Sequence, residues 1–194
     1  AFLNQNFKEL KNFALSLKEI YYRYSFSEKT LMVIFYLKQW EETPQKLLDF
    51  LQKQHKEAVS FYQALSTKKN HYLLRSSYKH LKGEKFLIDH LEQSEIKFRI
   101  FPDSFISPHI EQEENLYNYL FEQSLLKPQD KAIDFNADTG IFSLYLAKKI
   151  KMVYGFEENR FFIRDAVFNA RLNRLENALF FENSFNKEDI QKDI

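Results

Sequence analysis

The spacing of apolar and polar positions along the chain predicts an alternation of helices and strands. Residues 2–18 repeat apolar side chains every three or four positions, as on one face of a helix. Short apolar and aromatic runs bounded by turn residues predict strands at residues 20–26, 31–37, 59–64, 71–76 and 96–101. Thr43 and Pro44 predict a helix to about residue 57, with Thr43 as N-cap and Pro44 at the first helical position. Gly83 is expected at a turn.

The pattern changes in the second half of the chain. A helix is expected at 111–126, ended by Pro128, and a last helix at 160–174. Residues 133–144 form an apolar run that contains Asp134, then a short loop with Gly140, then a helix-like stretch. Residues 152–157 read as a second strand that ends in Glu157, and 178–181 as a third, parallel strand.

Strand, tight loop and helix in this order begin a Rossmann-like nucleotide-binding unit, in which the helix start faces the ligand. An acid in the place of Glu157 usually binds a ribose diol. We therefore expect an α/β protein of two domains. An N-terminal mixed α/β domain at 1–110 precedes the first part of a Rossmann-like sheet at 111–194.

Charge separates between the two halves, although the net charge is only +1. Residues 1–100 carry 17 Lys and Arg against 11 Asp and Glu, whereas residues 101–194 carry 11 against 16. The basic half suits a nucleic-acid backbone. Its candidate RNA contacts, with Tyr72 and Tyr78 interleaved, are Lys68, Lys69, Arg75, Lys79, Lys82 and Lys85. A solvated sheet face is the alternative interpretation of the same residues.

Residue usage narrows the chemistry further. The chain has no cysteine, which excludes a disulfide, a Cys-ligated metal and a thiol nucleophile within these residues. Its five histidines show no metal spacing, so no metal site is expected. No apolar stretch approaches membrane-spanning length and no signal-peptide layout is present, which favours a soluble cytoplasmic protein without membrane contact.

Several short pieces resemble one family in order and spacing. Residues 130–182 resemble the RNA 5-methyluridine methyltransferase (TrmA/RumA-like) family. The matching pieces are Ile133-Asp134-Phe135, Gly140 to Leu144, Gly155-Phe156-Glu157, Ala166, Asn169-Ala170, Asn173, Asn177 and Phe180. Upstream, the resemblance continues through Leu81-Lys82-Gly83, Phe98-Arg99-Ile100, Pro102-Asp103-Ser104-Phe105 and Leu116-Tyr117.

The resemblance implies a domain that binds the cofactor S-adenosylmethionine (SAM). It also implies that RNA is the substrate. The cofactor-binding residues it implies are Asp134, Asp138, Gly140, Glu157, Ser107, Phe105 and Ser184. Three of these depart from the family pattern: Asp138 replaces a loop glycine, Ser107 a glutamine and Ser184 an aspartate. Asp138 also has another interpretation, as a cap of the helix that follows.

The family reaction needs a thiolate that attacks carbon 6 of uracil and a base that removes the carbon-5 proton. We assign no catalytic residue, because the chain has no cysteine. Two explanations fit: a fragment of an enzyme, or a diverged relative that keeps a binding role. The substitutions at 107, 138 and 184 favour divergence. A non-catalytic RNA-binding or interaction protein is therefore the alternative function, and an open sheet edge is a candidate surface for a homo-oligomer.

Overall fold

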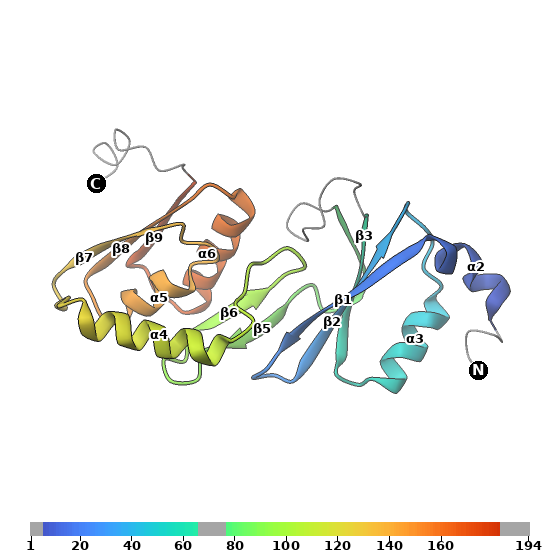
Figure 1. The fold of residues 1–194 in the computed structure, drawn as a ribbon, viewed down its shortest axis with the longest axis horizontal. Helices are drawn as coiled ribbons and strands as arrows, with labels where there is room; N and C mark the ends of the chain where they lie inside the picture. Colours follow the sequence, from blue (N-terminus) through green and yellow to red (C-terminus); the bar gives the residue numbers. More distant parts are fainter. Residues whose placement is uncertain (1–5, 66–76, 183–194) are drawn as a thin grey trace. The chain divides into compact units, whose positions relative to one another are not determined.

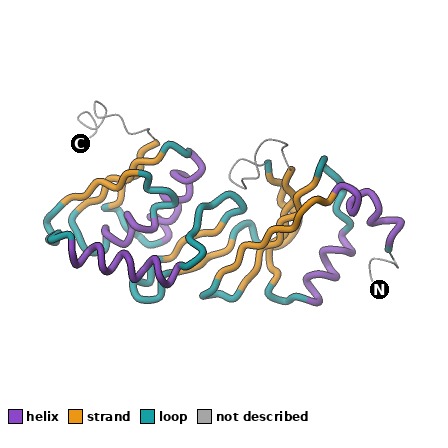
Figure 2. The backbone as a smooth tube through the Cα atoms, in the orientation of Figure 1, coloured by secondary structure: helices purple, strands orange, loops and turns teal. Residues whose placement is uncertain are grey.

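The computed structural model describes residues 6–65 and 77–182 (Figure 1). The chain divides into two compact units, one made of Ala1–Ile88 with Ile100–Asp103 and the other of Asp89–Arg99 with Ser104–Ile194. Figure 2 shows that helices and strands occur in both units. The α/β class expected from the sequence is therefore confirmed.

The first unit is built on a four-stranded mixed sheet of order β1-β2-β3-β4. Strand β2 is antiparallel to β1 and parallel to β3, and β4 is antiparallel to β3. The elements of this unit are α2 (Phe7–Ser16), β1 (Leu17–Ser25), β2 (Thr30–Leu37), α3 (Gln45–Gln54), β3 (Ala58–Leu65) and β4 (Tyr78–Gly83).

One face of this sheet carries the core of the unit. Val33 and Phe35 of β2 share a buried apolar cluster with Phe13 of α2 and Leu48 of α3. The Phe13 and Phe35 rings meet edge to face with their centroids 5.4 Å apart. Residues 32–37 of strand β2 are all buried, so both faces of this part of the strand are covered, which explains why its sequence lacks a polar alternation.

Two local predictions in this unit are wrong. Helix α3 begins at Gln45, and Pro44 occupies the N-cap position without a side-chain cap. The Thr43 hydroxyl instead accepts a hydrogen bond from the Gln63 amide. Gln63 is fully buried, and a buried amide is costly unless its donors find acceptors. Gly83 is the last residue of strand β4 and does not lie in a turn. The strand expected at 71–76 lies outside the described residues.

The second unit contains a three-stranded parallel sheet of order β7-β8-β9. Its helices and strands are α4 (Ile110–Gln123), β7 (Lys131–Phe135), α5 (Ile141–Ala147), β8 (Met152–Glu157), α6 (Arg160–Leu172) and β9 (Ala178–Glu182). The strand–loop–helix and the third parallel strand expected from the sequence are confirmed. Strands β5 (Leu87–His90) and β6 (Lys97–Ile100) form a separate pair, of which only β6 was expected.

Helix α4 ends earlier than predicted. It stops at Gln123, five residues before Pro128, and the Ser124 hydroxyl donates to the Phe121 carbonyl at 2.7 Å. Leu125 then adopts a left-handed backbone with φ of 57°. The helix is thus ended by a left-handed turn, and Pro128 lies beyond it.

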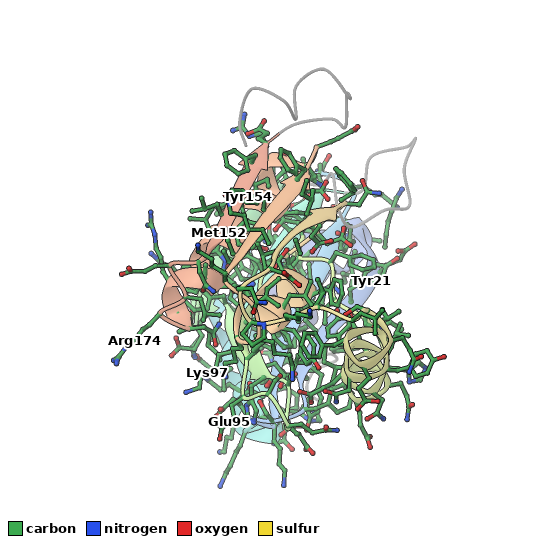
Figure 3. All side chains as sticks on the ribbon, turned by 90° about the vertical axis from the view of Figure 1, so that its left-hand side faces the viewer. Tyr21, Glu95, Lys97, Met152, Tyr154 and Arg174 are labelled. Carbon is green, nitrogen blue, oxygen red and sulfur yellow. The ribbon has the colours of Figure 1, made fainter. Side chains whose placement is uncertain are left out.

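The two faces of the parallel sheet differ. Helices α5 and α6 pack on the face that carries Val153 and Gly155. The opposite face aligns Ile133, Tyr154 and Leu179 across the three strands, and Ile133 and Leu179 remain exposed. Met152 shares this face with Tyr154, and both are labelled in Figure 3.

Candidate functional site

A cavity of about 160 Å³ lies in the second unit where strand β7 ends. Its walls come from the segment Phe105–Ser107, from helix α4 through Glu113 and Tyr117, and from Asp134 with the following loop. The carboxyl ends of parallel strands are where open α/β sheets bind ligands. The cavity is smaller than pockets that enclose whole drug-sized ligands, so it suits one end of a nucleotide-like molecule.

The loop at residues 136–140 has a strained backbone. Asn136, Asp138 and Gly140 have φ of 57°, 48° and 80°, all in the left-handed region. Glycine adopts this region freely, whereas another L-residue pays about 1–2 kcal/mol and Asn or Asp tolerate it best. Position 138 therefore has the backbone conformation of a glycine position, although an aspartate occupies it.

The interpretation of Asp138 as a helix cap is wrong. Helix α5 begins at Ile141, its N-cap is Gly140, and no side chain caps it. The loop N–H groups are used elsewhere: Ala137 donates to the Phe156 carbonyl at 3.0 Å and Gly140 to the Ala137 carbonyl at 2.7 Å. The N–H of Asp138 donates to Glu157 Oε2 at 3.2 Å. Glu157 thereby ties the loop to the end of β8.

Gly140 is needed for close packing as well as for its φ. A Cβ atom at this position would lie 2.8 Å from the Ala166 Cβ and 2.8 Å from the Phe180 ring. Loop, helix α6 and strand β9 therefore approach each other more closely than any larger residue would allow.

Carboxylates dominate the electrostatics of the cavity. Burial, and then the charges of Glu157, Asp134 and Glu113, raise the pKa of Asp138 to about 6. Burial also raises the pKa of Asp134, although its Oδ2 accepts a hydrogen bond from the Ser143 hydroxyl at 2.6 Å. The Tyr117 hydroxyl donates to Glu113 Oε1, and burial raises the pKa of Tyr117.

A buried polar network holds the wall formed by Phe105–Ser107. The Thr139 hydroxyl donates to the Phe105 carbonyl at 3.2 Å, and the Asn169 amide donates to the Thr139 carbonyl at 2.9 Å. Ser104 donates to Asp165 Oδ2 at 2.5 Å. Helix α6 therefore fixes both the loop and the segment that faces it.

The predicted cofactor residues are partly brought together. Phe105, Ser107, Asp134 and Asp138 line the cavity. Gly140 lies in its loop, and Glu157 is buried behind Asp138 rather than in the lining. Ser184 lies outside the described residues. Sequence reasoning missed Glu113 and Tyr117, because nothing in helix α4 indicates which of its acids faces the loop.

The predicted RNA contacts divide as well. Lys68, Lys69, Arg75 and Tyr72 lie outside the described residues. Lys82 forms an ion pair with Asp49 at 2.6 Å, so its charge is partly neutralised. Lys79 and Lys85 are exposed.

Tyr22 and Tyr24 point to the same face of β1 and Tyr21 to the other, as the strand alternation predicts.

Residues 6–65 and 77–182 were searched for a metal site and for a membrane-spanning helix. No group of three or more His, Cys, Asp or Glu in these ranges is arranged to hold a metal ion. None of their helices is long and apolar enough to cross a membrane.

Comparison with known proteins gives the relationship. No family model matches the chain. A protein of Halalkalibacterium halodurans named as an uncharacterized RNA methyltransferase is 32% identical over 167 residues, which are 85% of this chain and 36% of that protein. One of Oceanobacillus iheyensis with the same name is 30% identical over 166 residues, 84% of this chain and 36% of that protein.

The chain is a homologue of bacterial RNA methyltransferases. The predicted relationship to RNA methyltransferases is thereby confirmed, whereas the names of these relatives do not specify uracil as their target. The chain spans about a third of the length of the relatives it matches.

Solved structures agree on the fold. The tRNA (uracil-54, C5)-methyltransferase of Pyrococcus abyssi, in complex with S-adenosylhomocysteine, superimposes with a TM-score of 0.70 and 23% identity. The match covers 93% of this chain and 45% of that protein. The complex of aTrm5 with tRNALeu superimposes with a TM-score of 0.52 and 17% identity, over 94% of this chain and 51% of aTrm5. The Rossmann-like methyltransferase fold of the second unit is confirmed.

Proposed function

We propose that this chain provides the cofactor-binding part of a SAM-dependent RNA methyltransferase that modifies uracil at carbon 5. The observation that carries the proposal is the acid-lined cavity beyond β7, between the left-handed loop and the Phe105–Ser107 segment. The fold is shared with a uracil methyltransferase that was solved in complex with S-adenosylhomocysteine, which supports a ligand of this class.

The residues of the cavity fit the positively charged end of SAM. Glu113 Oε2 is buried and has no hydrogen-bond partner among the described residues, so it is available to a cationic group of the ligand. Asp134 and Asp138 add two carboxylates from the other wall. Glu157, which ends β8 outside this lining, retains acceptor capacity for ribose hydroxyls, because each of its oxygens accepts one N–H, from Asp138 and from Asn159.

The residues of the chain bind and orient rather than react. Bound SAM supplies an electrophilic methyl group. Asp134, Asp138 and Glu113 hold the charged end of the ligand, while Ile141 and Phe142 provide an apolar part of the cavity wall. A thiolate nucleophile is not among these 194 residues, which contain no cysteine. The alternative remains a non-catalytic RNA-binding role on the same fold, and a homo-oligomer through a sheet edge stays a prediction.

Blocking the cavity tests the proposal. Calorimetric titration of the wild-type chain with SAM is expected to give micromolar binding, and Ser107→Trp to weaken it by about tenfold or more, because the indole fills the cavity. Gln123→Trp, on the exposed end of helix α4, is the matched control and is expected to bind like wild type. Absence of heat and of a thermal shift at millimolar SAM, in a wild-type chain that unfolds cooperatively, would contradict the proposal.

We also propose that Lys79 and Lys85 contact RNA phosphates. Both are exposed in the first unit, and Lys79 lies on strand β4. Charge reversal of both is expected to lower RNA affinity by about tenfold at low salt. It should also reduce the slope of log affinity against log salt by about 1.4, since each phosphate contact contributes about 0.7 for single strands.

Filter-binding or anisotropy titrations at several salt concentrations measure both effects. Lys53→Glu with Lys56→Glu makes the same change in charge at exposed positions near the end of α3 and is the control. Equal losses in the two double variants would reduce the effect to net charge and contradict the assignment.

A further inference from the structure

The cavity beyond β7 carries acidic groups without any basic counterpart. Its acids come from three elements: Glu113 from helix α4, Asp134 from strand β7 and Asp138 from the loop. Every other described residue of the lining is apolar, aromatic, hydroxyl-bearing or an amide. Glu157 of β8 is a fourth acid, in contact with the backbone of Asp138. His109, which precedes α4, is exposed and outside the lining.

Two of these acids lack a compensating charge. Glu113 Oε2 is buried without a hydrogen-bond partner among the described residues. The charges that act on the Asp138 carboxyl come from Glu157, Asp134 and Glu113, which are all acids and raise its pKa. A buried carboxylate without a partner is costly, and a cation placed between such groups relieves that cost.

The loop offers few backbone N–H donors to an anion that could compete with a cation for this cavity. The N–H groups of Ala137, Asp138 and Gly140 all donate to acceptors within the protein. The cavity therefore presents carboxylate oxygens to a ligand, while three of its loop donors are already engaged.

We propose that Glu113 and Asp138 make this cavity selective for a ligand with a net positive charge, so that it binds SAM more tightly than S-adenosylhomocysteine. The inference rests on the proposed function. SAM carries a sulfonium ion where its demethylated product carries a neutral thioether, and the two ligands share every other group. An acid-lined cavity distinguishes them by charge alone, which favours release of the product after transfer.

The selectivity depends on pH in a defined direction. The pKa of Asp138 is raised to about 6, so its carboxyl is largely neutral at pH 5 and ionised at pH 7.5. A bound cation favours the ionised form, so SAM binding releases protons near pH 6. The affinity for SAM therefore rises between pH 5 and 7 and levels off above, while the affinity for S-adenosylhomocysteine changes less.

The experiment compares the two ligands on each variant by calorimetry. In the wild-type chain at pH 7.5, SAM is expected to bind about tenfold more tightly than S-adenosylhomocysteine. Asp138→Asn and Glu113→Gln are each expected to reduce that ratio about threefold or more, because both keep the side-chain shape and remove one charge. Glu111→Gln removes an exposed acid from the same first turn of α4 and is expected to leave the ratio unchanged.

Using the ratio makes the result independent of general damage to the fold, which would weaken both ligands together. Equal affinities of the wild-type chain for the two ligands would overturn the selectivity and leave SAM binding intact. An unchanged ratio in both Asp138→Asn and Glu113→Gln would overturn the assignment to these residues. Failure to bind either ligand would remove the proposed function and the selectivity with it.

Discussion

Gly83→Ala is expected to lower the free energy of unfolding of the first unit by about 3 kcal/mol or more. Gly83 has φ of 82°, which strains any other L-residue. Its added Cβ would lie 1.9 Å from the Val59 carbonyl oxygen and 2.9 Å from the Val59 carbonyl carbon. These atoms belong to the backbone of β3, so relief requires the strands to separate. The Glu84 N–H that donates to the same carbonyl at 2.8 Å would be lost too.

Urea denaturation followed by Trp40 fluorescence measures this effect, because Trp40 is the single tryptophan and lies in the first unit. Glu84→Ala changes the next, exposed residue and is expected to alter stability by less than about 0.5 kcal/mol. A midpoint for Gly83→Ala close to that of Glu84→Ala would show that the strand pair absorbs the methyl group.

Asp165→Asn is expected to destabilise the second unit by about 3–5 kcal/mol, because it leaves a buried guanidinium without its counter-ion. Arg99 donates to Asp165 Oδ1 through Nε at 2.8 Å and through Nη2 at 2.5 Å. The exposed fractions of the two side chains are 10% and 1%. The substitution also weakens the bond from Ser104, so the cavity wall beside the loop is expected to loosen.

Hydrogen exchange of the amides in helix α6 measures the loss, since the second unit has no tryptophan. Arg164 offers a matched control, because its guanidinium lies 3.4 Å from the same Asp165 oxygen but is 44% exposed. Arg164→Ala is expected to cost less than about 1 kcal/mol. Similar exchange rates in Asp165→Asn and wild type would mean that the buried pair contributes little beyond its own desolvation.

The sequence predicts well where the evidence is local. The run from Ile133 to Leu144 identifies strand, loop and helix, because an apolar strand followed by a left-handed glycine and a helical period leaves a signal within a dozen residues. The unusual place of Asp138 could be recognised the same way, since a glycine was expected there and its φ is 48°. The resemblance to RNA methyltransferases rests on such local pieces taken in order.

Local evidence fails where a distant residue competes for a group. The local sequence predicts Thr43 as an N-cap, but its hydroxyl accepts a hydrogen bond from the buried amide of Gln63, twenty residues away. The local sequence indicates that Lys82 belongs to a basic stretch, but in the structure it forms an ion pair with Asp49 of helix α3. In both cases burial or charge pairing across the fold outweighs a preference of about 1 kcal/mol in the local segment.

The sequence by itself determined the α/β class, the strands of the parallel sheet and the glycine that permits the loop, because these follow from periodicity and backbone sterics. Only the tertiary structure decided that Glu113 joins Asp134 and Asp138 around one cavity, and that Arg99 meets Asp165 across 66 positions of the chain. Such encounters depend on how helices pack against the sheet, and packing joins residues that no local period relates.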